Sequence, residues 1–246
     1  MDCALLSKGV KKEFFSRNDI FLAAKELEPN FKETQLRFYI GRLYDEGLIS
    51  KVGHNLYTHG QVERDVYSPI ESEAVKSIAS MMKAEFPLVS FRIWNLSCLN
   101  EFLGHLVAHD HVFLEVERDG LEFIFERIHD DSSKKVLLNP SQKEIDLYSS
   151  DGDILIFPLR TESPAGNTNE YGISLEKLVV DMFSSRIIQG FISQGDYPHA
   201  FEAMFSKYKV NQARLFRYAR RRNKADMLYS FLKEKTNVEL YVGAEP

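Results

Sequence analysis

The sequence predicts an α/β (α+β) protein of two domains. An N-terminal winged helix-turn-helix is expected over residues 1–65, followed over residues 66–246 by a mixed α/β sheet domain with a helical C-terminal part. Three observations lead to this prediction. Two amphipathic helix patterns and a hairpin pattern follow one another within the first sixty residues. Strand-like and helix-like segments then alternate as far as residue 159, and helical spacing of apolar residues dominates from residue 174 onward.

The first helix is expected to begin after Ser16. Ser16 and Asp19 fit the capping-box pattern, in which a hydroxyl and an acid three residues later satisfy each other's backbone N–H groups. The helix then presents one apolar face and ends at Glu28-Pro29-Asn30, because proline and asparagine favour a turn.

The second helix is expected to open near Thr34 and to end at Gly47, which can adopt the left-handed conformation of a C-cap. Two short extended pieces, residues 48–50 and 56–58, flank residues 51–55, which have the composition of a hairpin turn. This hairpin is the predicted wing.

The order of these elements, and the phrase LYDEGLISKVGHNLY over residues 43–57, resemble the winged helix-turn-helix superfamily. The resemblance implies a second helix that lies in the major groove of DNA. Once the apolar face is buried, the side chains left on that helix and on the wing are the candidate DNA contacts, namely Thr34, Gln35, Arg37, Phe38, Arg42, Lys51, His54 and Asn55. The alternative is a winged helix that contacts another protein, because residues 1–60 carry nine basic against eight acidic side chains.

Charge is distributed unevenly over the rest of the chain. Residues 61–204 carry 12 basic and 24 acidic side chains, whereas residues 205–225 carry eight basic side chains and no acid. On the helix predicted there, Arg214, Arg217 and Arg221 share one exposed face at spacings of three and four. This accessory basic face fits phosphates, an acidic partner, or the acidic middle of the same protein.

A boundary between domains is predicted near residue 65. Ser68 is expected to cap the next helix, since Pro69 and Glu71 stand at favoured first-turn positions. Helix patterns over 70–86, 99–109 and 121–129 then alternate with strand patterns over 88–94, 111–118, 134–139 and 153–159. A polar loop over residues 160–172 precedes the C-terminal helices.

Three segments together resemble the AbiEi-type antitoxins of type IV toxin-antitoxin systems, a group of abortive-infection regulators in phage defence. They are residues 86–105 (FPLVSFRIWNLSCLNEFLGH), residues 173–183 (ISLEKLVVDMF) and residues 208–222 (YKVNQARLFRYARRR). The resemblance implies transcriptional autorepression through the winged helix at the protein's own promoter. Because residues 1–60 have a net charge of only +1, further phosphate contacts are expected from a second copy of the winged helix in a homodimer on double-stranded DNA, or from the basic helix between Arg214 and Lys224. The resemblance further implies a C-terminal part that counters a nucleotidyltransferase-like toxin.

Possible metal sites have simpler explanations. His105 and His109 have the spacing of one helix face, with His111 nearby, but the segment lacks the glutamate of a zinc-protease helix, so ordinary helix-end histidines are expected. The acids Asp110, Glu115 and Glu117 lie on or before a strand and could hold Mg²⁺ in a nuclease. That alternative is disfavoured because an arginine stands where such sites usually carry a lysine. Asp151 and Asp153 flank Gly152, which is typical of a hairpin turn.

The sequence contains no P-loop, no G-x-G-x-x-G and no nucleophile elbow. We therefore expect a regulator without catalytic residues, bound metal or cofactor. The two cysteines, Cys3 and Cys98, lack C-x-x-C spacing, the start has no signal-peptide pattern, and no apolar run reaches eighteen residues. A cytoplasmic protein without contact to a membrane is the corresponding expectation.

Overall fold

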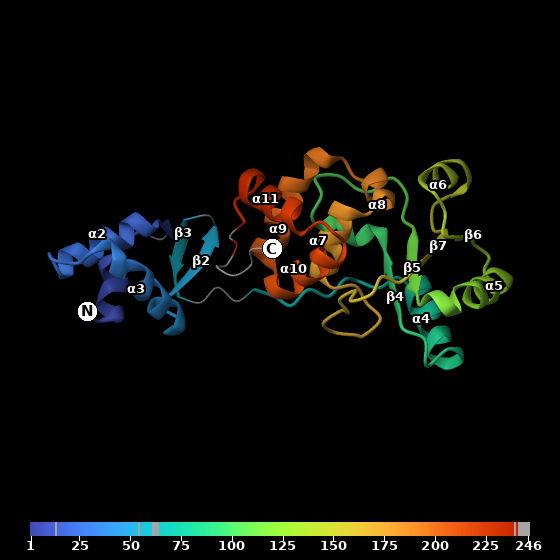
Figure 1. Ribbon diagram of the computed structural model, residues 1–246, viewed down its shortest axis with the longest axis horizontal. Coiled ribbons are helices and arrows are strands. Elements are labelled where there is room, and N and C mark those ends of the chain that lie inside the picture. Colours follow the sequence, from blue (N-terminus) through green and yellow to red (C-terminus); the bar gives the residue numbers. More distant parts are fainter. Residues whose placement is uncertain (13, 54, 61–63, 239, 241–246) are drawn as a thin grey trace. The chain divides into compact units, whose positions relative to one another are not determined.

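The chain divides into two compact units in a computed structural model that describes residues 1–12, 14–53, 55–60, 64–238 and 240 (Figure 1). Unit 1 contains Met1–Asp65 with Asn237 and Val238, and unit 2 contains Val66–Thr236 with Leu240. The predicted fold class is confirmed, because a winged helix precedes a mixed sheet and a helical C-terminal part. No helix among the described residues is long and apolar enough to cross a membrane.

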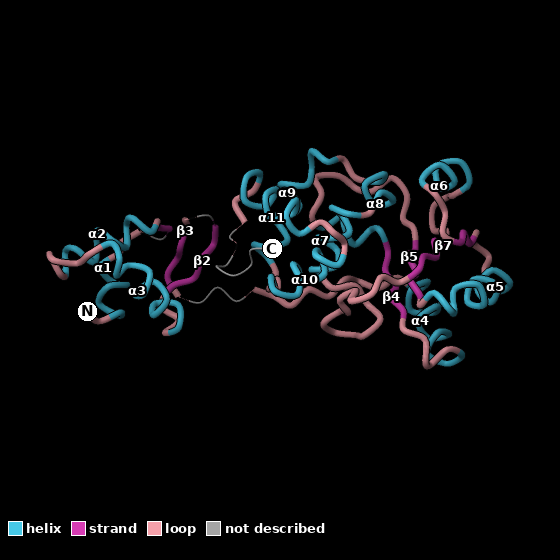
Figure 2. The backbone as a smooth tube through the Cα atoms, viewed as in Figure 1, coloured by secondary structure: helices cyan, strands magenta, loops and turns pink. Residues whose placement is uncertain are grey.

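Unit 1 has the element order of a winged helix. The helices are α1 (Cys3–Gly9), α2 (Arg17–Leu27) and α3 (Glu33–Asp45), and the strands are β1 (Phe14–Phe15), β2 (Ile49–Gly53) and β3 (Leu56–His59). The strands form an antiparallel sheet in the order β1-β3-β2, in which β2 and β3 are the wing (Figure 2). Neither α1 nor β1 was predicted from the sequence pattern.

Local signals explain where these elements begin and end. The Ser16 hydroxyl accepts a hydrogen bond from the Asp19 N–H, and the Asp19 carboxylate accepts one from the Ser16 N–H at 2.7 Å, so the predicted capping box is confirmed. Gly47 follows α3 with φ +67°, as its predicted C-cap role requires. Ile20, Leu36 and Leu43 are buried in one apolar cluster that fixes α2 and α3 in place.

Unit 2 is built on a four-stranded sheet. Its strands are β4 (Phe91–Asn95), β5 (Val112–Val116), β6 (Val136–Leu138) and β7 (Ile154–Pro158), in the order β4-β5-β7-β6. The β4–β5 pair is antiparallel and the other two pairs are parallel. Helix α4 (Glu73–Glu85) precedes β4 in the chain, α5 (Leu121–Asp131) lies between β5 and β6, and α6 (Gln142–Tyr148) lies between β6 and β7.

The C-terminal part is helical. It consists of α7 (Leu175–Ser184), α8 (Arg186–Phe191), α9 (Tyr197–Lys207), α10 (Gln212–Arg221) and α11 (Ala225–Lys235). Short 3₁₀ helices stand at η1 (Leu96–Glu101), η2 (Arg118–Gly120) and η3 (Gln194–Asp196).

The two faces of the sheet in unit 2 differ in chemistry. Because side chains alternate along a strand, Ile93, Leu114 and Ile156 share one face, where they form an apolar core with α4 and α5. The opposite face carries Trp94 and Phe113, which pair across β4 and β5, and Glu115. This second face is turned toward α7, since Glu115 forms an ion pair with Lys177 of that helix.

Two predicted helix positions in unit 2 are wrong. The helix after the boundary is capped by Ser72, whose hydroxyl accepts from the Val75 N–H, and not by Ser68. The helix predicted over residues 99–109 is replaced by η1, which ends at Glu101. Side-chain hydrogen bonds explain the difference: Asp110 accepts from the Ser97 N–H at 2.8 Å, and Asn100 accepts from the Val107 N–H at 2.8 Å, so the segment turns back.

Candidate nucleic-acid interface

Helix α3 buries one side and exposes the other. Leu36 and Leu43 face the core of unit 1, whereas all five α3 residues named from the sequence are exposed, namely Thr34, Gln35, Arg37, Phe38 and Arg42. Phe38 itself is 64% exposed. The structure therefore brings these side chains together on one accessible helix.

Two of the five already have partners within unit 1. The Gln35 side-chain oxygen accepts from the Lys32 N–H at 2.9 Å, which completes the first turn of α3 and leaves only its amide NH₂ to donate. The Arg42 guanidinium donates to Glu46 at 2.7 Å, and this bond raises the pKa of Arg42. Thr34 and Arg37 have no side-chain hydrogen bond or ion pair to any described residue.

The wing residues have more specific roles than the sequence indicated. The Lys51 ammonium lies 5.4 Å from the centre of the Tyr57 ring, and burial lowers the pKa of Lys51 to about 8. Asn55 adopts φ +49° at the turn, and its side-chain oxygen accepts from the Arg17 N–H at 2.9 Å. Asn55 thus ties the wing to the start of α2. His54 lies outside the described residues.

A pocket of about 510 Å³ lies where α2, α3 and the wing meet, and it contains charged side chains that sequence reasoning missed. Arg17 and Asn18 line it together with Glu33, Lys51 and Asn55. Arg17 and Asn18 lie between the capping residues Ser16 and Asp19 and were not among the predicted DNA contacts. Their position could have indicated a DNA contact, because the exposed first turn of a helix is a common place for phosphate contacts.

The basic helix α10 does not present its three named arginines alike. Arg214 is hydrogen-bonded to the buried Glu176 at 2.5 Å and also contacts the Ala165 carbonyl oxygen at 3.3 Å. Arg221 donates to the Thr161 hydroxyl, and the 66% exposed Arg217 lies 3.9 Å from Glu162. The accessory basic face was predicted to fit phosphates, an acidic partner or the acidic middle of the same protein. Arg214 contacts the last of these.

The named acids before and after the strands are engaged in turns. Asp110 accepts from the Ser97 hydroxyl at 2.8 Å, and Asp151 accepts from the Asp110 N–H at 2.7 Å. Asp153 accepts from the Ser150 N–H at 2.7 Å, beside Gly152 with φ +82°. Glu117 is exposed at the end of β5.

The three histidines do not share a helix face. His105 is half exposed and lies 3.9 Å from Asp196, whereas His111 is fully buried, and burial lowers its pKa. The His109 and His111 ring centres are 6.2 Å apart. Within the described ranges, no three His, Cys, Asp or Glu side chains are grouped as a metal site requires.

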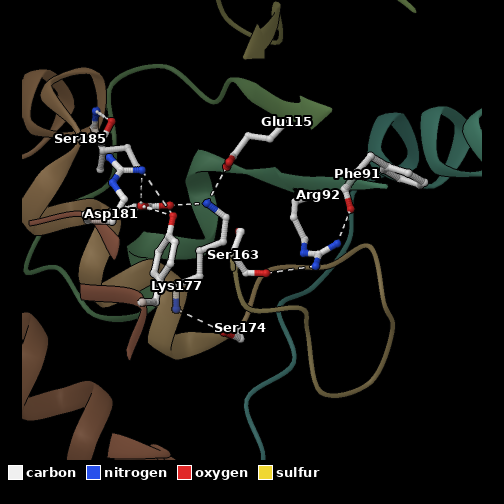
Figure 3. Close-up of polar contacts among 11 residues, drawn as sticks. Phe91, Arg92, Glu115, Ser163, Ser174, Lys177, Asp181 and Ser185 are labelled. Carbon is white, nitrogen blue, oxygen red and sulfur yellow. Dashed lines mark hydrogen bonds and ion pairs between the residues drawn. The ribbon is translucent and has the colours of Figure 1, made fainter. Parts of the chain in front are cut away.

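A buried ionic cluster in unit 2 was not foreseen from the sequence. Lys177 of α7 has no exposed surface and forms ion pairs with Glu115, at 2.7 Å, and with Asp181 (Figure 3). The Tyr218 hydroxyl donates to Asp181 at 3.0 Å, and Arg222 approaches the same carboxylate to 3.4 Å. Burial alone would lower the pKa of Lys177, but the two carboxylates outweigh it and raise that pKa.

Comparisons with known proteins place the chain in a family without giving a function. No curated protein matches its sequence. The crystal structure of the RV2827C protein from Mycobacterium tuberculosis aligns with 97% of this chain and 82% of that chain, at 12% identity and a TM-score of 0.35. At that level the likeness supports no conclusion about fold or function. A family described as a family of unknown function, DUF6577, matches residues 35–238, and the chain therefore belongs to that family.

Proposed function

We propose that this protein is a DNA-binding transcriptional regulator that recognises duplex DNA through unit 1. The observation that carries the proposal is the exposed face of α3, on which Thr34, Arg37 and Phe38 have no polar partner among the described residues. In a winged helix this face enters the major groove. An exposed helix with unoccupied side chains is what readout of base edges needs.

The side chains suit that readout. The Arg37 guanidinium can donate two hydrogen bonds to O6 and N7 of a guanine, and the Phe38 ring can pack on a thymine methyl group. Arg17, Asn18 and Lys51 stand beside α3 around the pocket between α2, α3 and the wing, where they can hold the phosphate backbone. Residues 1–60 have a net charge of only +1, so we propose a second copy of unit 1 on the same DNA as a source of further phosphate contacts.

The proposal is tested by fluorescence anisotropy with the full chain, on labelled duplex from upstream of its own gene and on a scrambled duplex of equal composition. We expect the natural sequence to bind at least about 10³-fold more tightly, the lower limit for specific DNA-binding proteins. Arg37→Ala should cost about 1–3 kcal/mol on the natural duplex and little on the scrambled one.

A matched control separates base readout from a general loss of charge. Lys143 is exposed on α6 of unit 2, so Lys143→Ala removes one positive charge without touching α3. This variant should bind both duplexes as the wild type does. Equal affinity of the wild type for the two duplexes, at every salt concentration tried, would contradict sequence-specific binding.

We further propose, from the resemblance of residues 173–183 and 208–222 to AbiEi-type antitoxins, that unit 2 counters a nucleotidyltransferase-like toxin. The test is co-expression with a nucleotidyltransferase-like protein encoded beside its gene. Rescue of growth by the full chain supports the antitoxin role. Unchanged toxicity, or the lack of such a neighbour, removes this part of the proposal and leaves DNA binding unaffected.

A further inference from the structure

We propose that unit 2 contains a binding pocket for a mononucleotide, independent of any DNA binding by unit 1. The cavity has a volume of about 430 Å³ and lies between the second face of the sheet and the segment that joins α7 to α8. Trp94, Phe113 and Phe157 line it from the sheet, Arg160 lines it from the segment that follows β7, and Ser184 and Arg186 line it from the end of α7 and the start of α8. Its volume is within the range of about 300–1,000 Å³ that is typical of small-molecule sites.

Aromatic rings form one wall of the cavity. Trp94 and Phe113 are cross-strand neighbours whose ring centres are 4.5 Å apart at an interplanar angle of 17°, and Phe113 and Phe157 are 5.9 Å apart at 19°. Trp94 and Phe113 are almost completely buried and stack on each other, so the half-buried Phe157 is the ring of this wall against which a flat, conjugated ligand such as a nucleobase can pack.

Two buried polar groups at the cavity are unsatisfied. The indole N–H of Trp94 and the hydroxyl of Ser184 are both shielded from solvent, and neither has a hydrogen-bond partner in the part of the chain that the structure describes. Trp94 as a whole is only 2% exposed. An unsatisfied buried donor costs free energy, so such groups usually have a partner. The ring nitrogens and carbonyl oxygens of a nucleobase are acceptors of the kind that the indole N–H requires.

The charges around the cavity favour an anion. The carboxylates of Glu115 and Asp181 are compensated by Lys177 and Arg222. Two further cations of the cavity, Arg160 and Arg186, are not compensated by a carboxylate. Both are exposed, and neither has a side-chain hydrogen bond or ion pair to any described residue. Four cations against two carboxylates leave two positive charges, although residues 61–204 are strongly acidic overall. A guanidinium is the side chain best suited to phosphate, which it binds through two parallel hydrogen bonds.

The ring-binding wall and the two free arginines together define the ligand class. Inorganic phosphate would use the arginines but not the aromatic wall, and a nucleoside would use the wall but not the arginines. A mononucleotide uses both, and neither part of the cavity belongs to the candidate DNA interface in unit 1.

The only tryptophan in the chain, Trp94, lines this cavity, so its fluorescence reports directly on occupancy. We would titrate the full chain with AMP, GMP, CMP and UMP, and repeat each titration by calorimetry, which does not depend on absorbance. We expect saturable binding of at least one nucleotide. The matching nucleoside and inorganic phosphate should each bind with an affinity at least about tenfold lower, which is the minimum we take for a contact that contributes to affinity.

Variants assign the binding to this cavity. Arg160→Gln combined with Arg186→Gln should weaken the nucleotide at least about tenfold, the effect of losing a charge-assisted contact. Arg118→Gln removes another exposed arginine, one that does not line the cavity, and should leave the affinity unchanged. Because all three side chains are exposed, the variants should keep the wild-type melting temperature.

Three results would overturn the proposal. The first is the absence of saturable binding for all four nucleotides up to about 1 mM, the weak end of specific affinities. The second is that inorganic phosphate binds as tightly as each of the four nucleotides, which would mean that the cavity recognises only an anion. The third is unchanged nucleotide affinity in the double arginine variant. None of these results depends on whether unit 1 binds DNA.

Discussion

Replacement of Lys177 by methionine tests the buried ionic cluster that joins α7 to the sheet of unit 2. Methionine is close to lysine in length and is apolar, so Lys177→Met removes the charge with little change in volume. Two carboxylates, of Glu115 and Asp181, then lose the ammonium that both contact. Their side chains are only 11% and 5% exposed, so water cannot replace it.

The expected cost follows from this burial. Removal of one partner from a buried ion pair typically destabilises a protein by about 3–5 kcal/mol, because the other charge is left uncompensated. Asp181 keeps the Tyr218 hydroxyl at 3.0 Å and Arg222 at 3.4 Å, so we expect the lower end, about 3 kcal/mol. In a unit of this size, that loss lowers the melting temperature by about 6–12 °C.

The assay is urea unfolding followed by circular dichroism at pH 7. Lys177→Met combined with Glu115→Gln should recover part of the stability. As a control, Lys76→Met breaks an exposed pair with Glu73 and should cost less than about 1 kcal/mol. A deficit for Lys177→Met as small as that of the control would refute the reasoning.

Three further predictions concern DNA affinity, a helix end and a basic helix. With the pKa of Lys51 lowered to about 8, its ammonium is charged below that pH and neutral above it, so DNA affinity should fall between pH 7 and pH 9. Lys51→Arg should remove this dependence in anisotropy titrations, and an identical pH profile in the variant would contradict the assignment. Gly47→Ala forces a Cβ into the left-handed region at φ +67° and should destabilise unit 1 by about 1–2 kcal/mol in urea unfolding, whereas an unchanged midpoint would argue against it. On α10, Arg214→Ala leaves Glu176 buried without its cation and should cost about 3 kcal/mol. Arg217→Ala, at an exposed position, should cost less than about 1 kcal/mol, so equal effects in thermal melts would contradict the difference in pairing.

The sequence predicted those features whose causes are local. The Ser16–Asp19 capping box and the left-handed Gly47 each depend on residues within a few positions, and both are present as predicted. The same kind of signal failed at Ser68, where Ser72 four residues later offered an equivalent cap and the helix began there. Short elements also escaped notice: α1 has seven residues and β1 has two, too few for a periodic pattern.

The candidate sites show the same limit. The exposed residues of α3 could be named because helical spacing separates a buried side from an exposed one. The pairing of Glu115 with Lys177 could not be predicted, because β5 and α7 are distant in the chain and meet only through packing. The metal-site pattern required a lysine near the second acid, Glu117, where the sequence has Arg118, and it gave no indication of a lysine from α7. The cavity around Trp94 was missed for the same reason, since its walls come from β4, β5, β7 and the segment after α7.

Selection from a random pool of duplexes, followed by sequencing of the bound fraction, tests sequence-specific recognition by α3 most directly. The account predicts that the full chain enriches one motif, and that Arg37→Ala loses the preference at a guanine within it while it keeps the rest. The Lys143→Ala variant should enrich the wild-type motif without change. A pool that remains without a common motif after repeated rounds, or a motif identical in the wild type and Arg37→Ala, would contradict the account.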